Sequence, residues 1–381
     1  MAQREIRACA QLQEPMTKRN KPSPEGNERG MKGRASRSNI SGRFERVQTE
    51  EFDDGWSGGE DVAAPRIGTT LTVEKAKVIL SRNESPDIGF DRSINPYRGC
   101  EHGCIYCFAR PSHAYLGLSP GLDFETRLFY KPDAARLLAK ELSQPGYAPR
   151  RVQLGANTDC YQPIESRLTI TRDVLKVLAE FRHPLGITTK NHMVTRDIDI
   201  LSPMAEQNLA FVVISITTLD RQLARAMEPR ASAPHRRFDA VRELSRAGIP
   251  VIVNVSPIIP GLSDHEIESI LEHAAQAGAR YAHYSILRLS HELRDLFKEW
   301  LEAERPDRAD RVMSLVRQTR SGKENDTRFG LRMVGEGPVA DMLIDRFRMA
   351  RRRFGLDKKI VPLRTDLFRV PSRPGDQLAL F

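Results

Sequence analysis

Three cysteines within a short run, Cys100, Cys104 and Cys107, are the side chains best placed to do chemistry in this chain. Their spacing, C-x3-C-x2-C, lets three thiolates face one inorganic centre, whereas a closed structural site takes four protein ligands. His102 could complete a zinc site, but zinc ligands usually come as two separated pairs and His102 lies inside the tight loop. Three thiolates on a [4Fe–4S] cluster would leave one iron free for a reacting molecule, and this interpretation suits the spacing better.

Other polar side chains lie where predicted strands end. From about residue 67, short apolar runs alternate with amphipathic helical patterns, which predicts βα units and a parallel sheet. In such folds the active site lies at the carboxyl ends of the strands. The residues that fall there after the cysteine loop are Asp159, Cys160, Lys190, Ser215, Ser256 and Arg288.

The elements that must position these side chains can be given by range. We expect strands over residues 92–97, 151–155, 185–189, 210–216, 250–256 and 281–287. We expect helices over 134–142, 172–181, 235–247 and 264–277, with a capping box of Ser263 and Glu266 before the last and Gly248 and Gly278 ending two of them. Six such units predict an α/β fold, a partial (β/α)6 TIM-type barrel.

Four regions of the chain differ in composition. Residues 1–65 are rich in Arg, Lys, Ser, Gly and Glu, which predicts a disordered N-terminal tail that is first basic and then acidic. Residues 66–290 carry the barrel pattern. Residues 291–357 are typical of a helical C-terminal extension, and residues 358–381 of a C-terminal tail.

The overall composition limits the class of protein. The chain has 381 residues, of which 40% are hydrophobic, and this is enough for a large core. Five cysteines, an odd number, do not indicate a disulfide framework, so we expect a reducing cytoplasm. The apolar runs are too short to span a membrane, and the start of the chain lacks the apolar segment of a secretory signal.

The charge balance favours a polyanionic partner. The net charge is +9, which suits nucleic acid or describes a solvated basic surface alone. The strongest basic run is residues 346–359, where Phe347 and Phe354 are interleaved with arginines and lysines. Such a stripe suits phosphate contact with base stacking, or else an amphipathic helix whose Phe side chains pack inward.

The cysteine motif, with Tyr106 before its last cysteine, resembles the signature of the radical SAM superfamily. The resemblance implies that Cys100, Cys104 and Cys107 hold a [4Fe–4S] cluster whose fourth iron binds the amino and carboxylate groups of S-adenosylmethionine (SAM). It also implies a reductase or flavodoxin-type electron donor. One electron would then cleave SAM to methionine and a 5′-deoxyadenosyl radical, which abstracts a hydrogen atom from a substrate.

A finer resemblance, over roughly residues 90–290, is to the spore photoproduct lyase branch and its uncharacterised bacterial relatives. It is carried by the cysteine loop and by the segments Thr188-Thr189-Lys190, Ser215-Ile216 with Glu228-Pro229, and Val255-Ser256-Pro257-Ile258. This resemblance implies that Lys190 pairs with the SAM carboxylate and that Tyr106 lies near the adenine. Ser215 and Ser256 are expected to contribute to the same cofactor site.

Asp159 and Cys160 each have two interpretations. Asp159 either contacts a ribose hydroxyl or the amino group of SAM, or it caps the helix that follows. The lyase donates a hydrogen atom from a cysteine near the end of its second strand, and Cys160 lies in the corresponding region. The alternative for Cys160 is a small core residue.

The last five residues carry a separate signal. Gln377-Leu378-Ala379-Leu380-Phe381 resembles the peptide by which bacterial replication and repair proteins dock on the DNA sliding clamp, and a Pro- and Gly-containing stretch precedes it. Such a peptide works as a tethered segment whose Leu and Phe enter apolar pockets. The alternative is an apolar tail that packs on its own domain.

Three functions remain open at this point. The leading hypothesis is a radical SAM enzyme that acts on nucleic acid, by lyase-like repair of a DNA lesion or by modification of a base. The second is the same chemistry on a protein or a small molecule; with only Cys9 and Cys160 outside the motif, an auxiliary cysteine-ligated cluster is not expected. The third is a non-enzymatic, metal-containing adaptor associated with DNA.

Overall fold

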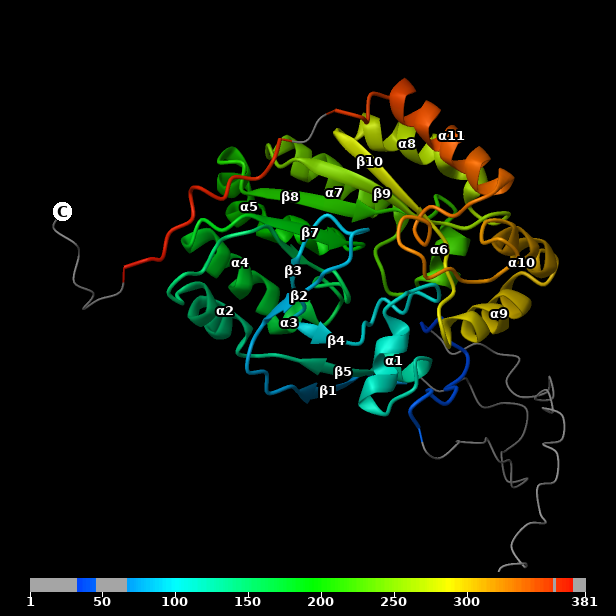
Figure 1. The fold of residues 1–381 in the computed structure, drawn as a ribbon, viewed down its shortest axis with the longest axis horizontal. Helices are drawn as coiled ribbons and strands as arrows, with labels where there is room; N and C mark the ends of the chain where they lie inside the picture. Colours follow the sequence, from blue (N-terminus) through cyan, green and yellow to red (C-terminus); the bar gives the residue numbers. More distant parts are fainter. Residues whose placement is uncertain (1–32, 46–66, 359–360, 373–381) are drawn as a thin grey trace, which may run out of the picture.

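A seven-stranded sheet forms the centre of the computed structural model, which describes residues 33–45, 67–358 and 361–372 (Figure 1). Its strands are β2 (Leu80–Arg82), β3 (Arg92–Ile94), β6 (Val152–Leu154), β7 (Leu185–Thr189), β8 (Ala210–Ser215), β9 (Val251–Ile258) and β10 (Tyr281–Ile286). The spatial order is β10-β9-β8-β7-β6-β3-β2. The strands β3, β6, β7, β8, β9 and β10 are parallel neighbours and β2 is antiparallel to β3, so the predicted partial (β/α)6 barrel is confirmed.

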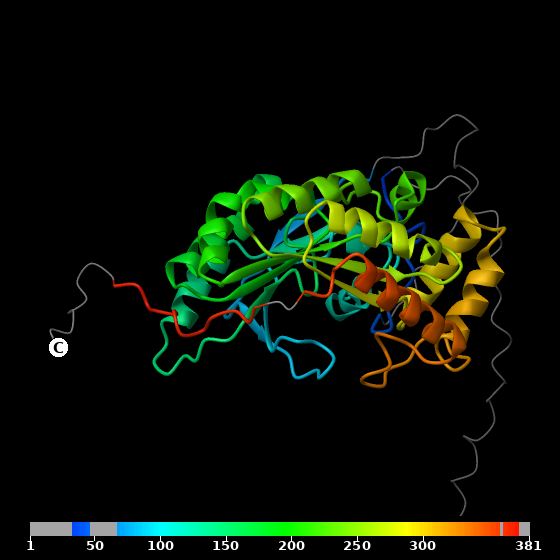
Figure 2. The same ribbon diagram turned by 90° about the horizontal axis from the view of Figure 1, so that it is seen from above.

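Helices cover one face of this sheet, as the green and yellow-green ribbons of Figure 2 show. Those of the barrel are α2 (Ala134–Leu142), α3 (Glu165–Leu168), α4 (Ile170–Glu180), α5 (Ile198–Glu206), α6 (Arg221–Met227), α7 (Pro234–Arg246) and α8 (Ile267–Gln276), with 3₁₀ helices η1 (Arg110–Leu116), η2 (His192–Asp197) and η3 (Asp264–Glu266). Parallel strands that are buried on both faces have nearly continuous apolar sequences, and β8, with Ala-Phe-Val-Val-Ile, is an example. No helix in the described ranges is long and apolar enough to cross a membrane.

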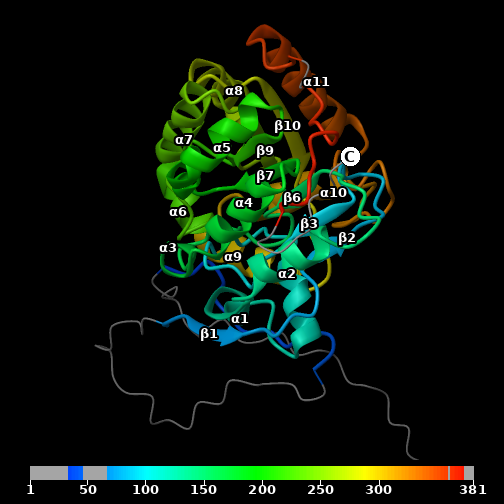
Figure 3. The same cartoon turned by 90° about the vertical axis from the view of Figure 1, so that its left-hand side faces the viewer.

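A second, three-stranded sheet lies below the barrel in Figures 1 and 3. It consists of β1 (Thr70–Val73), β5 (Arg127–Tyr130) and β4 (Tyr97–Arg98), next to the short helix α1 (Leu122–Thr126). The strand expected over residues 92–97 is therefore two strands in different sheets. The break falls at Asn95-Pro96, where proline removes the N–H group that a continuing ladder needs.

Residues 33–45 correct the prediction of a disordered tail over residues 1–65. Ala35 and Ser36 are buried, and their backbone N–H groups donate to the Glu125 carboxylate at 3.2 and 2.9 Å. Arg34 donates to the Glu125 carbonyl at 2.7 Å and to the Thr69 hydroxyl at 3.0 Å. We call residues 33–45 the N-terminal strap. The rest of the predicted tail, residues 1–32 and 46–65, lies outside the described residues.

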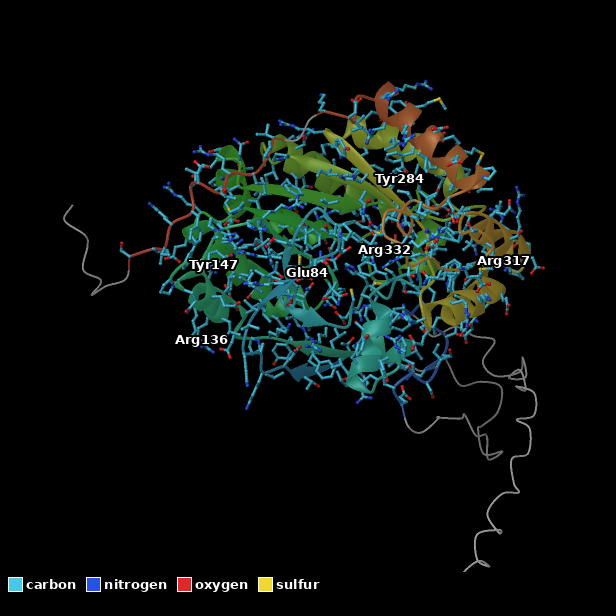
Figure 4. All side chains as sticks on the ribbon, viewed as in Figure 1. Glu84, Arg136, Tyr147, Tyr284, Arg317 and Arg332 are labelled. Atoms are coloured by element: carbon cyan, nitrogen blue, oxygen red, sulfur yellow. The ribbon has the colours of Figure 1, made fainter. Side chains whose placement is uncertain are left out.

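The region after the barrel contains the expected helices, α9 (Leu293–Glu304), α10 (Ala309–Gln318) and α11 (Pro338–Arg353). In the basic stripe on α11, Phe347 is buried and its ring lies 4.6 Å from that of Tyr284, which is labelled in Figure 4. Arg346 pairs with Glu268 at 2.7 Å. The inward-packing interpretation of this stripe is therefore confirmed, and the base-stacking interpretation is wrong for Phe347.

The predicted capping box before α8 is wrong. Ser263 makes no side-chain capping bond to this helix. Glu266 instead accepts hydrogen bonds from the Thr218 hydroxyl and from the backbone N–H groups of Leu219 and Asp220, the latter two at 3.2 Å. Its carboxylate thus orders the turn before α6. The glycine stops are as predicted, since Gly248 and Gly278 both have positive φ, 78° and 99°.

Residues 361–372 run along the end of the barrel where the strands begin (Figures 1 and 3). The N–H of Arg364 donates to the carbonyl of Asn208 at 2.9 Å, and the N–H of Arg369 to that of Phe181 at 3.1 Å. The Phe368 ring packs against those of Phe181 and His183, at 6.2 and 5.7 Å. The predicted docking peptide Gln377–Phe381 lies outside the described residues.

Candidate active site

The cysteine loop, residues 99–107, follows β4 and is held from both sides. The N–H of Cys100 donates to the carbonyl of Phe124 in α1, and the N–H of Ile105 to the carbonyl of Met227 at the end of α6, both at 2.9 Å. Cys100 and Cys104 are buried, whereas Cys107 is partly exposed. The loop therefore has a fixed backbone and one thiol that solvent or a ligand can reach.

A buried ion pair fixes the middle of this loop. Arg110, at the start of η1, is fully buried and donates to the carbonyls of Gly103 and Cys104, each at 2.8 Å. Its charge is balanced by Glu125, also fully buried, at 2.5 Å. Gly103 has φ of 66°, and a Cβ there would lie 2.6 Å from the Glu125 carboxylate, so only glycine fits.

His102 points from the loop to the ends of the barrel strands. Its Nδ1 lies 3.3 Å from Asp159, and its Nε2 lies 3.3 Å from the amide of Asn191. Asp159 also accepts from the Thr189 hydroxyl at 2.7 Å and from the N–H groups of Lys190 and Tyr161 at 2.8 and 2.9 Å. Burial raises the pKa of Asp159, but His102 and these donors outweigh it and hold the pKa at about 2.

These contacts change the interpretation of both residues. A carboxylate has about four acceptor positions, and those of Asp159 are used by protein donors. The structure therefore favours a positioning role for Asp159 over the predicted contact with SAM. Both ring nitrogens of His102 lie near protein partners, Asp159 and Asn191. This argues against the alternative interpretation of His102 as a fourth zinc ligand.

Tyr106 is the centre of a second buried network. Its hydroxyl donates to Glu228 and lies 3.0 Å from the Thr217 hydroxyl. Glu228 also pairs with Arg237 of α7, and both of these charged side chains are about 1% exposed. Burial, the Cys104 thiol and Glu228 raise the pKa of Tyr106 well above its ordinary value, so the phenol stays neutral.

The remaining predicted cofactor residues join this network through the backbone. Arg237 donates to the Ser215 carbonyl at 3.0 Å, and Thr217 donates to the Ser256 carbonyl at 3.2 Å. The Ser256 hydroxyl bonds to that of Ser285 on β10. Tyr106, Ser215 and Ser256 are thus brought together at the carboxyl ends of β8 and β9, as expected.

Lys190 places a cation beside the cysteine loop. Its Nζ lies 5.7 Å from the centre of the Tyr106 ring, and no carboxylate of the described ranges lies within ion-pair distance of it. Burial lowers the pKa of Lys190, but Cys104, Glu228, Cys107 and Asp159 raise it above its ordinary value overall. The side chain is therefore a charged donor with capacity for an anionic ligand.

Cys160 does not join the site. Its side chain is fully buried in the main hydrophobic core, and its carbonyl accepts the Thr171 hydroxyl at 2.6 Å. Gly155 lies against it, where an added Cβ would be 3.6 Å from the sulfur and 2.2 Å from the Thr188 carbonyl. A hydrogen-atom donor must touch its substrate, so the structure supports the core interpretation and not the predicted catalytic role.

The three thiols of the loop suit a cluster better than a single ion. Within the described ranges, no group of three or more His, Cys, Asp or Glu side chains is arranged to hold a metal ion. A [4Fe–4S] cluster takes one thiolate on each iron, so its ligands need not converge on one atom. Burial raises the pKa of Cys104 to about 12, and it raises the pKa of the Cys100 thiol well above its ordinary value. Buried thiols of this kind need a bound cation to ionise, which a cluster supplies.

Several residues of the site were not predicted. Arg110, Glu125 and Arg237 gave no signal, because buried charges look like surface charges in a sequence. Glu228 was noted only as part of a resemblance. The one local signal that could have been followed is Gly103, whose position between two cysteines indicates a tightly packed backbone.

Comparison with known proteins bears on this geometry. A family model described as the radical SAM superfamily matches residues 94–274. An uncharacterised protein of Mycobacterium tuberculosis (strain ATCC 25618 / H37Rv) is 35% identical over 261 residues, which are 68% of this chain and 77% of the relative. A radical SAM Nalpha-GlyT isomerase of Pseudomonas phage M6 is 25% identical over 187 residues, 48% of this chain and 36% of the relative.

Among solved structures, the fold is similar to that of spore photoproduct lyase complexed with dinucleoside spore photoproduct. The TM-score is 0.55 with 17% sequence identity, and the match covers 74% of this chain and 78% of the lyase. At this identity the likeness concerns the fold.

Proposed function

Because the chain belongs to the radical SAM superfamily, we propose that Cys100, Cys104 and Cys107 hold a [4Fe–4S] cluster and that the enzyme acts on nucleic acid. The observation that carries the site assignment is that the cysteine loop, through the ring of Tyr106, meets the ammonium group of Lys190 at the carboxyl end of β7. When bound, the cluster and SAM supply a 5′-deoxyadenosyl radical for hydrogen abstraction.

The residues of the chain would bind and orient these groups. Lys190 offers an ammonium group to the SAM carboxylate, since it is charged and has no carboxylate partner in the described ranges. Tyr106 offers an aromatic face whose position Glu228 holds through the phenol. Asp159 keeps the backbone of Lys190 and the ring of His102 in place. Such fixed positions are what orientation of a reactive intermediate requires.

Three observations support a nucleic-acid substrate. The net charge is +9, which favours a polyanion. The lyase with a similar fold binds a dinucleoside photoproduct. The C-terminal five residues resemble a sliding-clamp peptide, which would bring the enzyme to DNA. Repair of a lesion and modification of a base both fit these observations. We also propose that the protein works in the cytoplasm. A reducing compartment keeps the cluster thiolates intact and contains the electron donor, a reductase or a flavodoxin-type protein.

The test is release of 5′-deoxyadenosine after anaerobic reconstitution with iron and sulfide. Wild-type protein given dithionite and SAM is expected to release it, and Cys104→Ala is expected to lose at least about 100-fold, because one iron loses its ligand. Cys9→Ala, outside the motif, serves as the matched control. Equal release by wild type and Cys104→Ala would sink the proposal.

The substrate class is tested in the same assay. Ultraviolet-damaged DNA, undamaged DNA, RNA and a nucleic-acid-free reaction are compared for stimulated release and for a new product by mass spectrometry. Stimulation by one of the nucleic acids is expected. No stimulation and no product with any of them would leave the radical chemistry in place and refute the substrate class, in favour of a protein or a small molecule.

A further inference from the structure

Phe108, the residue after Cys107, faces solvent. Its side chain is 51% exposed, so its ring can contact a ligand from solvent. The guanidinium of Arg288 lies 5.8 Å from the centre of the Phe108 ring. Arg288 follows β10 at its carboxyl end, so this pair borders the end of the barrel that carries the cysteine loop.

Arg288 has no ion-pair partner in the part of the chain that the structure describes. In the described ranges no carboxylate lies within ion-pair distance of its guanidinium, and no hydrogen bond to its side chain is formed. Its charged neighbours are Arg332 and Asp87, and Asp87 is already paired with Arg332. The Asp87 carboxylate therefore balances the charge of Arg332, and the charge of Arg288 remains in local excess.

A second aromatic–arginine pair continues the row. Phe329 is 60% exposed, and the Arg332 guanidinium lies 4.7 Å from the centre of its ring. Asp87 anchors this segment, since it accepts the N–H of Gly330 at 2.6 Å and pairs with Arg332. Figure 4 labels Glu84 and Arg332, which come from the two segments joined by Asp87. The row Phe108–Arg288–Arg332–Phe329 is thus built on three ordered segments.

We propose that this row is a stacking platform that receives a nucleotide of single-stranded or flipped-out nucleic acid beside the cysteine loop. Exposed aromatic rings stack on bases of any sequence, and a guanidinium next to them holds a phosphate or stacks in turn. Two exposed rings flank two guanidinium groups, of which that of Arg332 is paired with Asp87, so the row offers a stacking surface for a base next to a cation for its phosphate. The inference rests on the proposed nucleic-acid substrate and names the surface that would bind it.

A short single-stranded oligonucleotide that carries one 2-aminopurine is the probe. Fluorescence of this base is quenched when it stacks on an aromatic ring, and anisotropy of an end label gives the affinity. We expect quenching and binding with the reconstituted wild-type protein. Phe108→Ala and Phe329→Ala, which change exposed side chains, are each expected to bind about tenfold more weakly with less quenching. Phe108→Trp is expected to retain both.

Arginine variants separate charge from stacking. Arg288→Ala is expected to weaken binding and to reduce the slope of log affinity against log salt by about one, as loss of one phosphate contact does. Arg288→Lys keeps the charge and is expected to restore the salt slope. An unchanged slope in Arg288→Ala would overturn the phosphate contact.

Tyr115→Ala is the matched control. Tyr115 is 70% exposed, and Arg43 lies 5.3 Å from its ring centre, so it is an aromatic–arginine pair that is not a member of the row. Equal loss in Tyr115→Ala, or wild-type binding in both Phe variants, would overturn the platform. A third result would also overturn the platform. If SAM displaced the oligonucleotide and Phe108→Ala also bound SAM more weakly, the Phe108 ring would belong to the cofactor site.

The outcomes distinguish the platform from the proposed function. Wild-type protein that quenches 2-aminopurine but releases no 5′-deoxyadenosine would refute the radical chemistry and retain the platform. Release of 5′-deoxyadenosine together with unaltered oligonucleotide binding by all row variants would refute the platform and retain the radical chemistry.

Discussion

Glu228 is a carboxylate with almost no access to water, and it is shared by Tyr106 and Arg237. Taking a charge out of water costs several kcal/mol, which only a close and hydrogen-bonded partner offsets. Arg237 also donates to the carbonyls of Ser232 and Ser215 at 2.7 and 3.0 Å, so the pair ties the end of β8 to the aromatic ring of the cysteine motif. The charge pair thus orients the Tyr106 ring.

Removing one partner of this pair should therefore be costly. We expect Glu228→Ala to lower the free energy of unfolding by about 3–5 kcal/mol, because the buried Arg237 charge is left uncompensated. Urea unfolding followed by circular dichroism measures this. The control is Glu243→Ala, which breaks the more exposed pair with His192 and should cost less than about 1 kcal/mol.

The double variant Glu228→Leu with Arg237→Met sharpens this test. It removes both charges and should recover much of the stability lost in Glu228→Ala. Its SAM affinity should still be weaker than that of the wild type, because the Tyr106 hydroxyl has lost its acceptor. Equal costs for Glu228→Ala and Glu243→Ala would contradict the account of a buried pair.

Among single residues, the three cysteines and Lys190 could be predicted from the sequence, but the residues that hold them in place could not. Cysteine spacing is local, and Lys190 follows a strand whose position is clear from its apolar run. Tyr106 and Glu228 are 122 residues apart in the sequence, and no local pattern joins them. Cys160 is the opposite case: its place near a strand end suggested a catalytic role, whereas its side chain lies in the hydrophobic core, which was the other interpretation.

The N-terminal strap is the element that most changes the picture of the cysteine loop. Its backbone N–H groups at Ala35 and Ser36 complete the hydrogen bonding of Glu125, which in turn holds Arg110 against the loop carbonyls. Arg34 adds a bond to Thr69, whose hydroxyl donates to Glu101 of the loop at 2.7 Å. The strap is therefore structurally continuous with the site.

A chain that begins after residue 45 should hold its cluster poorly. It loses charge-assisted hydrogen bonds to Glu125, each worth about 1.5–3 kcal/mol, and we expect a lower iron content and faster loss of the cluster absorbance under a chelator. A chain that lacks only residues 1–32 keeps every one of these bonds and is the control. If both truncations retained the cluster like the full chain, the strap would have no part in holding the loop.

The elements themselves were largely predictable where one pattern dominates. β7 and α2 have the expected bounds, because an apolar strand and an amphipathic helix each depend on short-range periodicity. The second sheet was missed, since β4 has only two residues and β1 is mostly exposed. Glu266 was misassigned because its partners, Thr218 and Leu219, precede it by more than forty residues.

For the whole molecule, the C-terminal peptide offers a test of partner choice. We expect the full chain to be captured by an immobilised bacterial sliding clamp, and the variant Leu378→Ala with Phe381→Ala to lose capture at least about tenfold, because these side chains would fill the apolar pockets. Val370→Ala, an exposed apolar residue of the described C-terminal segment, is the control. Capture that survives the double substitution would refute docking through this peptide.

The course of residues 361–372 has a further consequence for how such a partner could be used. Their contacts with Phe181 and Asn208 take the chain to the starts of the strands, whereas the cysteine loop lies at the strand ends. A protein bound beyond Ser372 and a substrate bound near Cys107 would then not compete for the same surface. The enzyme could release one product and engage the next site on the same DNA while still attached. Processivity, rather than the rate of a single turnover, is the property that this segment would set.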